Sequence, residues 1–230
     1  MKKNLLFFAF ALLSLASIVT SCGKEDEPAV VTPTPTARIL VTHASPDAPG
    51  VDLLVDNIVK NTAALNYPNS TGYITLNAGL RNIKVNASGT STSVINADAT
   101  FVANKSYSIF AADSLSVITP IVIEDNLATP AAGKAHVRFV HLSPNAPAVD
   151  IAVTGGSNLF SNVSFKEYGD FLPVDAGTYS LDAKVAGTST VALTVPGVVL
   201  EAGKIYTIFA KGFLGGMGTQ ALGAQVIANN

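Results

Sequence analysis

Short runs of alternating apolar and polar residues recur along most of this chain. In the segment ILVTH, Ile39, Val41 and His43 share one face of an extended strand, and the segment VDLLV alternates in the same way. Later segments, such as YITLNAG, RNIKVNA and SYSIFAA, have the same period. Turn-forming residues separate these runs about every 8–12 positions, which is the spacing of a β-sandwich or barrel. With no convincing amphipathic helix, the pattern predicts an all-β chain.

The β pattern occurs twice along the chain, as an internal repeat. Residues 43–52 read HASPDAPGVD, and residues 141–150 read HLSPNAPAVD. The two halves align without a gap around this phrase, and after one inserted residue NKSYSIFA in the first half matches GKIYTIFA in the second. The repeat is as long as an ordinary domain, which excludes a solenoid unit. The sequence therefore predicts two copies of one domain.

We expect these copies to be tandem antiparallel β-sandwiches, at residues 37–127 and 134–230, with about seven strands each. The small residues of DNLATPAAGK, at positions 125–134, mark the linker between them. The expected architecture is immunoglobulin-like. The Cys…Trp…Cys core of antibody domains is absent, because the chain has no Trp and a single Cys.

The N-terminus has the features of a processing signal. Residues 1–21 begin with Lys2 and Lys3, continue in an apolar run and end in small residues before Cys22. This run suits a secretory signal and is too short for a comfortable transmembrane helix. The ending VTSC resembles a bacterial lipobox, which implies cleavage before Cys22 and diacylation of its sulfur. The protein is then held to a membrane by its lipid; the alternative is a plain secretory signal with a chance Cys.

Residues 22–36 are predicted to be the lipidated Cys followed by a flexible tether. The segment is first charged, then rich in Pro and Thr, and has no apolar periodicity. Its charged run consists of Lys24, Glu25, Asp26 and Glu27. This run resembles the surface-export signal of Bacteroidota lipoproteins, which implies an outer-membrane lipoprotein on the cell surface. Alternatively the run is a solvated linker and the protein stays on the periplasmic face.

The composition excludes several classes of function. Only 13% of the residues are charged and the formal net charge is −2, so the chain has no basic surface for nucleic acid. A single Cys cannot form an internal disulfide, so hydrophobic cores alone must hold the domains. The chain also lacks GxSxG, HExxH, paired CxxC and phosphate-loop motifs.

The repeated phrase is interpreted mainly as a turn between the first two strands of each domain. Its shared residues are His43, Ser45, Pro46, Pro49 and Asp52 in the first copy, and His141, Ser143, Pro144, Pro147 and Asp150 in the second. Ser, Asp and Asn side chains bond nearby backbone in turns, and Pro fixes φ. Each His is expected to be half-buried and hydrogen-bonded to the turn or to the nearby Asp.

The alternative interpretation of the phrase is a metal or catalytic site. The candidate ligands are His43, Asp47, Asp52 and Asp56. The second copy, however, carries Asn145 and Thr154 where the first has Asp47 and Asp56. We therefore assign no metal, no cofactor and no catalytic residue, and keep a polar ligand contact at this loop as a further alternative.

Three smaller features complete the candidates. Asp113-Ser114-Leu115 resembles the O-glycosylation motif of Bacteroidota, which would modify Ser114. Residues 211–225 are Gly-rich with apolar residues between the glycines. They form either a contact patch or a loop folded back on its own core. His136 is expected to be an exposed residue at a strand start.

The openings of the two copies, ARILVTHASPDAPGVDLLVD and AHVRFVHLSPNAPAVDIAV, resemble the domain-of-unknown-function 4397 family. The resemblance implies tandem, β-sandwich-like, extracytoplasmic modules without established activity, and it supplies no catalytic residues. Two hypotheses for function follow. The chain is a surface binding or adhesion module for an unknown glycan or protein, or it is a structural accessory lipoprotein. A hydrolase is the least supported class, because no nucleophile–base or metal constellation is evident.

Overall fold

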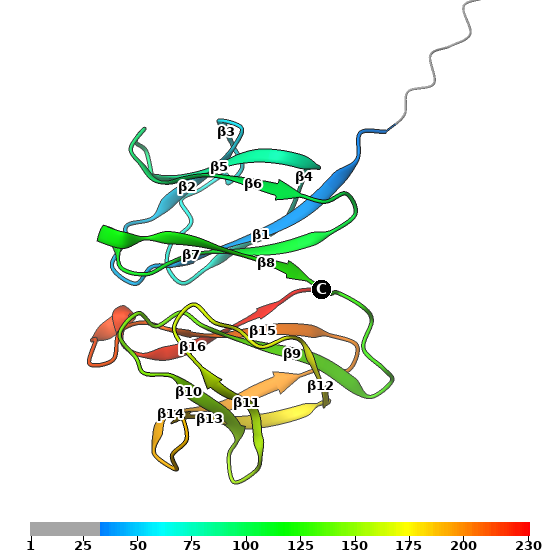
Figure 1. Ribbon diagram of the computed structural model, residues 1–230, viewed down its shortest axis with the longest axis vertical. Coiled ribbons are helices and arrows are strands. Elements are labelled where there is room, and N and C mark those ends of the chain that lie inside the picture. Colours follow the sequence, from blue (N-terminus) through cyan, green and yellow to red (C-terminus); the bar gives the residue numbers. More distant parts are fainter. Residues whose placement is uncertain (1–32) are drawn as a thin grey trace, which may run out of the picture. The chain divides into compact units, whose positions relative to one another are not determined.

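Strands account for nearly all the regular structure of residues 33–230 (Figure 1). The computed structural model describes residues 33–230, in which Thr34–Asn230 form one compact unit. The predicted signal, Cys22, the charged run at residues 24–27 and most of the tether lie outside the described residues. Within the described part, no helix is long and apolar enough to cross a membrane. Two short 3-10 turns occur there, η1 (Leu115–Val117) and η2 (Gly218–Gln220).

The first repeat folds into two four-stranded sheets. Its strands are β1 (Thr36–Ala44), β2 (Val51–Val55), β3 (Ile58–Val59), β4 (Ser70–Asn77), β5 (Gly79–Ala87), β6 (Ser93–Phe101), β7 (Ser106–Ala112) and β8 (Thr119–Asp125). One sheet has the order β4-β1-β7-β8 and the other has the order β3-β2-β5-β6. All pairs are antiparallel except β1 with β7. The strand beyond the seven expected is β3, which pairs with the end of β2.

The second repeat has the same topology. Its strands are β9 (Lys134–His141), β10 (Val149–Val153), β11 (Asn158–Val163), β12 (Leu172–Asp175), β13 (Gly177–Val185), β14 (Val191–Leu200), β15 (Ile205–Lys211) and β16 (Gly223–Ala228). The sheet orders are β12-β9-β15-β16 and β11-β10-β13-β14, again with one parallel pair, β9 with β15. The predicted class, two tandem β-sandwiches, is confirmed. The strand order differs from that of antibody constant domains, so the likeness to them is one of architecture.

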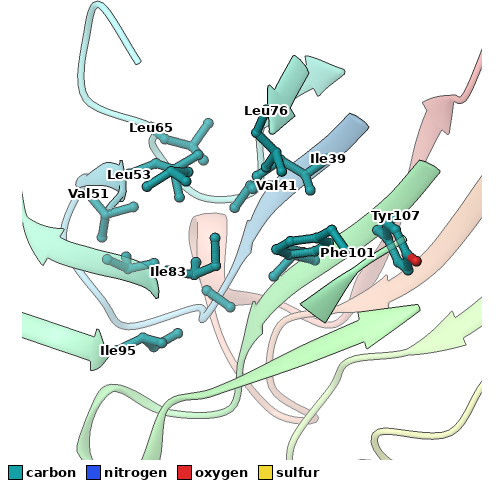
Figure 2. Packing of buried hydrophobic residues seen from close by; sticks show 14 of the residues in the cluster. Ile39, Val41, Val51, Leu53, Leu65, Leu76, Ile83, Ile95, Phe101 and Tyr107 are labelled. Carbon is teal, nitrogen blue, oxygen red and sulfur yellow. The ribbon is translucent and has the colours of Figure 1, made fainter. Parts of the chain in front are cut away.

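Each sandwich closes over its own apolar core. Figure 2 shows the first core, where Ile39 and Val41 of β1 meet Leu53 of β2 and Ile83 of β5 across the two sheets. The second core is built in the same way from side chains of both its sheets, including Val137, Phe139, Ile151, Leu181 and Ile208. The alternation seen in the sequence places these side chains on inner faces. Each such burial contributes about 1.5–3 kcal/mol relative to exposure.

A third apolar cluster joins the two repeats. From the first repeat it takes Leu40, Ala44, Phe110, Ala112 and Ile123, and from the second Val140, Leu142, Phe209 and Ile227. The rings of Phe110 and Phe209 meet edge to face, with centroids 6.0 Å apart. Strand β7 is consequently buried at all seven positions, because one face packs on its own core and the other on the second repeat. The β4-β1-β7-β8 sheet therefore packs on the β12-β9-β15-β16 sheet.

Candidate functional site

The two histidines of the repeated phrase are structural groups inside the fold. His43 and His141 are fully buried, so the half-buried position expected from the sequence is wrong. The Nε2–H of His43 donates to the Pro49 carbonyl at 2.9 Å, and that of His141 donates to the Pro147 carbonyl at 3.0 Å. Each ring thus stabilises the turn that follows it through one hydrogen bond. Burial lowers the pKa of both histidines, which favours the neutral ring.

The Asp or Asn of the phrase fastens the turn to a second loop, as does Ser143 in the second copy, whereas Ser45 donates to Asp47 Oδ1 at 3.5 Å within the phrase. Asn145 accepts from the Leu214 N–H at 2.7 Å and donates to the Leu214 carbonyl at 3.0 Å. Asp47, its counterpart, accepts from the Leu115 N–H at 2.8 Å. Ser143 donates to the Gly212 carbonyl at 2.6 Å. The exchange of Asp for Asn between the copies therefore preserves a loop contact, which the sequence did not indicate.

The last Asp of the phrase accepts hydrogen bonds from neighbouring segments of its own sheet. Asp52 accepts from Ser88 Oγ and from the Gly89 N–H, both at 2.9 Å. Asp150 accepts from the Asn162 N–H at 2.7 Å and from the Gly187 N–H at 3.0 Å. These backbone donors lower the pKa of Asp150. Neither carboxylate forms a hydrogen bond with His43 or His141 in the described structure. Of the two expected partners of each histidine, the turn backbone and the nearby Asp, the structure shows the turn backbone.

The positions of the four candidate ligands in the repeated phrase do not support a metal site there. His43, Asp47 and Asp52 each bond a different part of the domain, and Asp56 binds the Asn82 N–H at 3.0 Å and the Arg81 guanidinium at 3.2 Å. Within residues 33–230, no group of three or more His, Cys, Asp or Glu side chains could hold a metal ion. The prolines Pro46 and Pro144 lie in the turn after β1 and in the corresponding turn after β9.

The remaining candidates lie on loops and strand starts. Ser114 is half-buried and directly precedes η1. The Gly-rich loop folds back through a bond from the Phe213 N–H to the Gln220 carbonyl at 2.8 Å. It nevertheless leaves Met217 86% exposed and Leu214 half-exposed. The loop therefore combines features of the two predicted forms, a loop folded back on its own core and an exposed contact patch. His136 lies in β9 and is half-buried, not exposed as expected.

Sequence reasoning missed a buried polar network between the repeats. Arg138 of β9 pairs with Asp125 of β8, with Nη2 2.7 Å from Oδ1. The same guanidinium donates to Ser108 at 2.7 Å and to Thr207 at 2.8 Å. Asp125 in turn accepts from Ser108 Oγ at 2.9 Å and from the Tyr73 hydroxyl. Burial and the Asp125 charge raise the pKa of Tyr73, so this hydroxyl stays protonated and donates.

The network completes an interface between equivalent faces of the two repeats. Tyr73 has Phe171 as its counterpart, and the Arg138 guanidinium lies 4.5 Å from the Phe171 ring centroid. Asn229 takes the place of Asp125 and donates to the Tyr73 hydroxyl at 3.1 Å. The sequence signal was present, because Arg138 interrupts the apolar run AHVRFVH where the first copy has Leu40.

An open groove runs along one side of this junction. It consists of three adjoining hollows of 420, 290 and 480 Å³. The first two share Tyr168 and Gly169, and the last two share Glu124 and Asn126. Arg138 lines the middle hollow, so the buried network lies beside the groove. Two of these volumes fall within the range of about 300–1,000 Å³ that is usual for ligand sites.

The fold defines a pair of tandem β-sandwich modules that pack through equivalent faces. The sequence model described as "Domain of unknown function (DUF4397)" matches residues 37–152 and 153–230. The chain therefore belongs to the DUF4397 family.

Comparison with solved structures gives two distant likenesses. The Bacillus anthracis TIE protein shares 11% identity at a TM-score of 0.25 over 77% of this chain, which spans 33% of that protein. A family-26 carbohydrate-binding module of Eubacterium rectale Amy13K, in complex with maltoheptaose, shares 11% identity at a TM-score of 0.26. That match covers 83% of this chain and 96% of the module. No curated protein matches the chain. At these TM-scores neither likeness bears on function.

Proposed function

We propose that this chain is a non-catalytic, lipid-anchored binding protein of the cell envelope. The observation that carries the proposal is a contrast between two regions. The polar groups of the repeated phrase bond within the protein, as His43 and His141 do through Nε2. Both rings are fully buried and burial lowers their pKa, which leaves them poor general bases for an external substrate. The junction, by contrast, holds an open groove next to a rigid network. A fixed concave surface without an activated nucleophile suits recognition better than turnover.

Anchoring rests on the sequence around Cys22, and surface exposure on the charged run behind it. Intact cells treated with protease test both features, with the mature chain followed by blotting beside a periplasmic marker. We expect digestion of the wild-type chain while the marker survives, and release of a Cys22→Ala variant from the membrane fraction. Protection of the wild-type chain would refute surface exposure. It would move the search for partners to the periplasmic face.

Binding itself is tested with the soluble unit Thr34–Asn230, which forms one compact body with its own cores. The immobilised protein is exposed to a panel of oligosaccharides and to the matrix proteins collagen and fibronectin, with heat-denatured protein as the control. Saturable binding of one class, with the ligand recovered unchanged, is the expected result. Recovery of a shortened sugar or a cleaved protein would contradict the non-catalytic assignment.

An accessory lipoprotein that supports another envelope protein is the second candidate. The observation in its favour is the buried contact between the repeats, which would make the chain a rigid spacer. Under this hypothesis no soluble ligand binds the isolated unit. A photo-crosslinker placed at Met217, which is 86% exposed, would instead link the chain to one defined membrane protein in cells.

A further inference from the structure

We propose that the junction groove binds a neutral oligosaccharide, with one sugar ring stacked on Tyr168. This inference rests on the binding function proposed above and names its ligand class. Tyr168 is 46% exposed, although an aromatic ring of this size is usually mostly buried. It lines the two hollows that meet beside it, so its ring lies along the path of an extended ligand. A pyranose offers one apolar C–H face to such a ring and hydroxyls around its rim.

The backbone holds Tyr168 in place before any ligand arrives. Tyr168 forms an isolated bridge with Val140 of β9, and the next residue, Gly169, donates its N–H to the Phe139 carbonyl at 3.0 Å. A side chain at Gly169 would clash with Phe160, since an added Cβ would lie 2.3 Å from Cδ1 of that ring. The segment is therefore locked against the sheet. A preformed contact ring reduces the entropy lost on binding.

The internal repeat shows that the shared fold does not require this tyrosine. Ser70 occupies the equivalent position of the first copy, and Gly72 stands where the second copy has Asp170. Positions that hold the sandwich together, such as His43 and His141, are the same in both copies. Tyr168 and Asp170 are both exposed, line the same hollow and occur only in the second copy. Binding of a ligand explains this pair of residues better than a role in folding does.

The charges of the groove favour a neutral ligand. Four cationic and four carboxylate side chains line the three hollows, so their formal charges cancel. Three of the four cations are engaged in ion pairs, and the fourth, Arg38, donates to Ser106 Oγ at 3.0 Å. Arg138 pairs with Asp125 at 2.7 Å, Lys105 with Glu124 at 2.7 Å and Lys166 with Asp113 at 2.8 Å. Phosphate or sulfate groups would have to break such pairs, whereas neutral hydroxyls do not.

Hydrogen-bonding groups lie on both sides of the aromatic ring. Asn162 lines the first hollow, Asp170 and Asn126 line the middle one, and Asn126 continues into the third. All three side chains are exposed. Amide and carboxylate groups can each meet a hydroxyl that both donates and accepts. Three hollows in sequence suit several linked sugar rings better than a single one.

An extended peptide is less favoured by this lining. Peptides in grooves are commonly recognised through apolar pockets for their side chains. The hollow of 150 Å³ under Leu214 and Leu222 has that character, but it shares no lining residue with the junction groove. A sugar that needs one apolar face and several polar contacts is the better match for the groove.

The test is calorimetric titration of Thr34–Asn230 with four neutral hexasaccharides: cellohexaose, laminarihexaose, chitohexaose and mannohexaose. A hyaluronan hexasaccharide and a proline-rich peptide serve as anionic and peptide probes. Variants Tyr168→Ala, Tyr168→Phe and Asp170→Asn are compared with Leu80→Ala, which truncates another exposed side chain, on β5. Equal urea midpoints establish that each variant is folded. Sugar recovered from each titration is examined for shortening.

We expect one neutral hexasaccharide to bind, Tyr168→Ala to weaken it about tenfold or more, and Tyr168→Phe to stay within about twofold. The Leu80→Ala control is expected to bind as the wild type does. Binding unaffected by Tyr168→Ala would overturn the groove assignment and leave the binding function standing. Binding of none of the neutral sugars, or of the anionic or peptide probe alone, would also overturn it. Shortened sugar that depends on Tyr168 would support the groove and overturn the non-catalytic function.

Discussion

Arg138 of the second repeat and Asp125 of the first form a buried ion pair across the domain junction, with side chains 2% and 0% exposed. Removing two charges from water is costly, and their attraction compensates for it only when further hydrogen bonds satisfy both groups. Ser108, Thr207 and Tyr73 supply those bonds. Because the bonds come from both repeats, the pair is satisfied only when the two sandwiches pack as observed. The ion pair therefore favours the observed packing of the two repeats.

Breaking this pair should cost much more than replacing it. We expect Asp125→Asn to lower the free energy of unfolding by about 3 kcal/mol, because the Arg138 charge stays buried without its partner. The double variant Arg138→Leu with Asp125→Asn should recover most of the loss, since Leu40 and Asn229 already occupy the equivalent positions in the other copies. Urea unfolding measures both variants.

The exposed pair Lys105–Glu124, at 2.7 Å, is the matched control. Its loss in Lys105→Ala should change the free energy of unfolding by less than about 1 kcal/mol, as expected for surface pairs. A double variant at Arg138 and Asp125 that is no more stable than Asp125→Asn would show that the charges themselves are required.

The apolar contact between Phe110 and Phe209 should couple the unfolding of the two repeats. Both rings are fully buried, so Phe209→Ala is expected to cost about 3–5 kcal/mol. It removes a side chain of the junction cluster while the two domain cores stay intact. Differential scanning calorimetry should then resolve two transitions where the wild type gives one. The truncation Met217→Ala, at a side chain 86% exposed, should leave the single transition in place.

Stability should fall on mild acidification because of the two buried histidines. Burial lowers the pKa of His43 and His141 below the 6.5 of the unfolded chain, so the unfolded state binds more protons at low pH. Their contribution is complete above pH 6.5 and decreases as the pH falls below it. The nearby Glu167 charge opposes the shift at His141 without reversing it. Asp150, whose pKa is lowered from 3.8, loses its contribution only at more acidic pH.

Urea midpoints between pH 7.5 and 5 measure this slope. In the double variant His43→Gln with His141→Gln, the amide can still donate to Pro49 and Pro147, and the slope should largely disappear. An unchanged slope in that variant would assign the pH dependence to other groups.

Two hydrogen bonds, here called the loop clamp, hold the Gly-rich loop to Asn145, and the complete clamp should require the Asn145 amide. In Asn145→Asp the bond from the Leu214 N–H is kept, but the donation to the Leu214 carbonyl is lost. We expect a loss of about 0.5–1.5 kcal/mol and faster hydrogen exchange in the Gly-rich loop. The reverse change Asp47→Asn keeps the acceptor for the Leu115 N–H and should be nearly neutral. Equal effects of the two changes would argue against the clamp.

The chain's own pattern determined a large part of this structure. Alternation in segments such as VDLLV and SYSIFAA predicted strands because one face of each strand must be buried in a core, and the doubled phrase predicted two copies of one domain. The turn role of the phrase also follows from local chemistry, since Pro and Ser act within a few residues of themselves. These features depend on short sequence distances.

The tertiary structure alone decided the rest. The sequence could not show that Asn145 bonds Leu214, that Arg138 pairs with Asp125, or that Tyr168 lies where two hollows meet. Each of these depends on strands far apart in the chain becoming neighbours. In the sequence Arg138 is a polar exception in an apolar strand, and only the packing of two equivalent faces shows its partner Asp125. Local periodicity records which side of a strand is buried, but it carries no information about what lies opposite, because that is set by the packing of whole sheets.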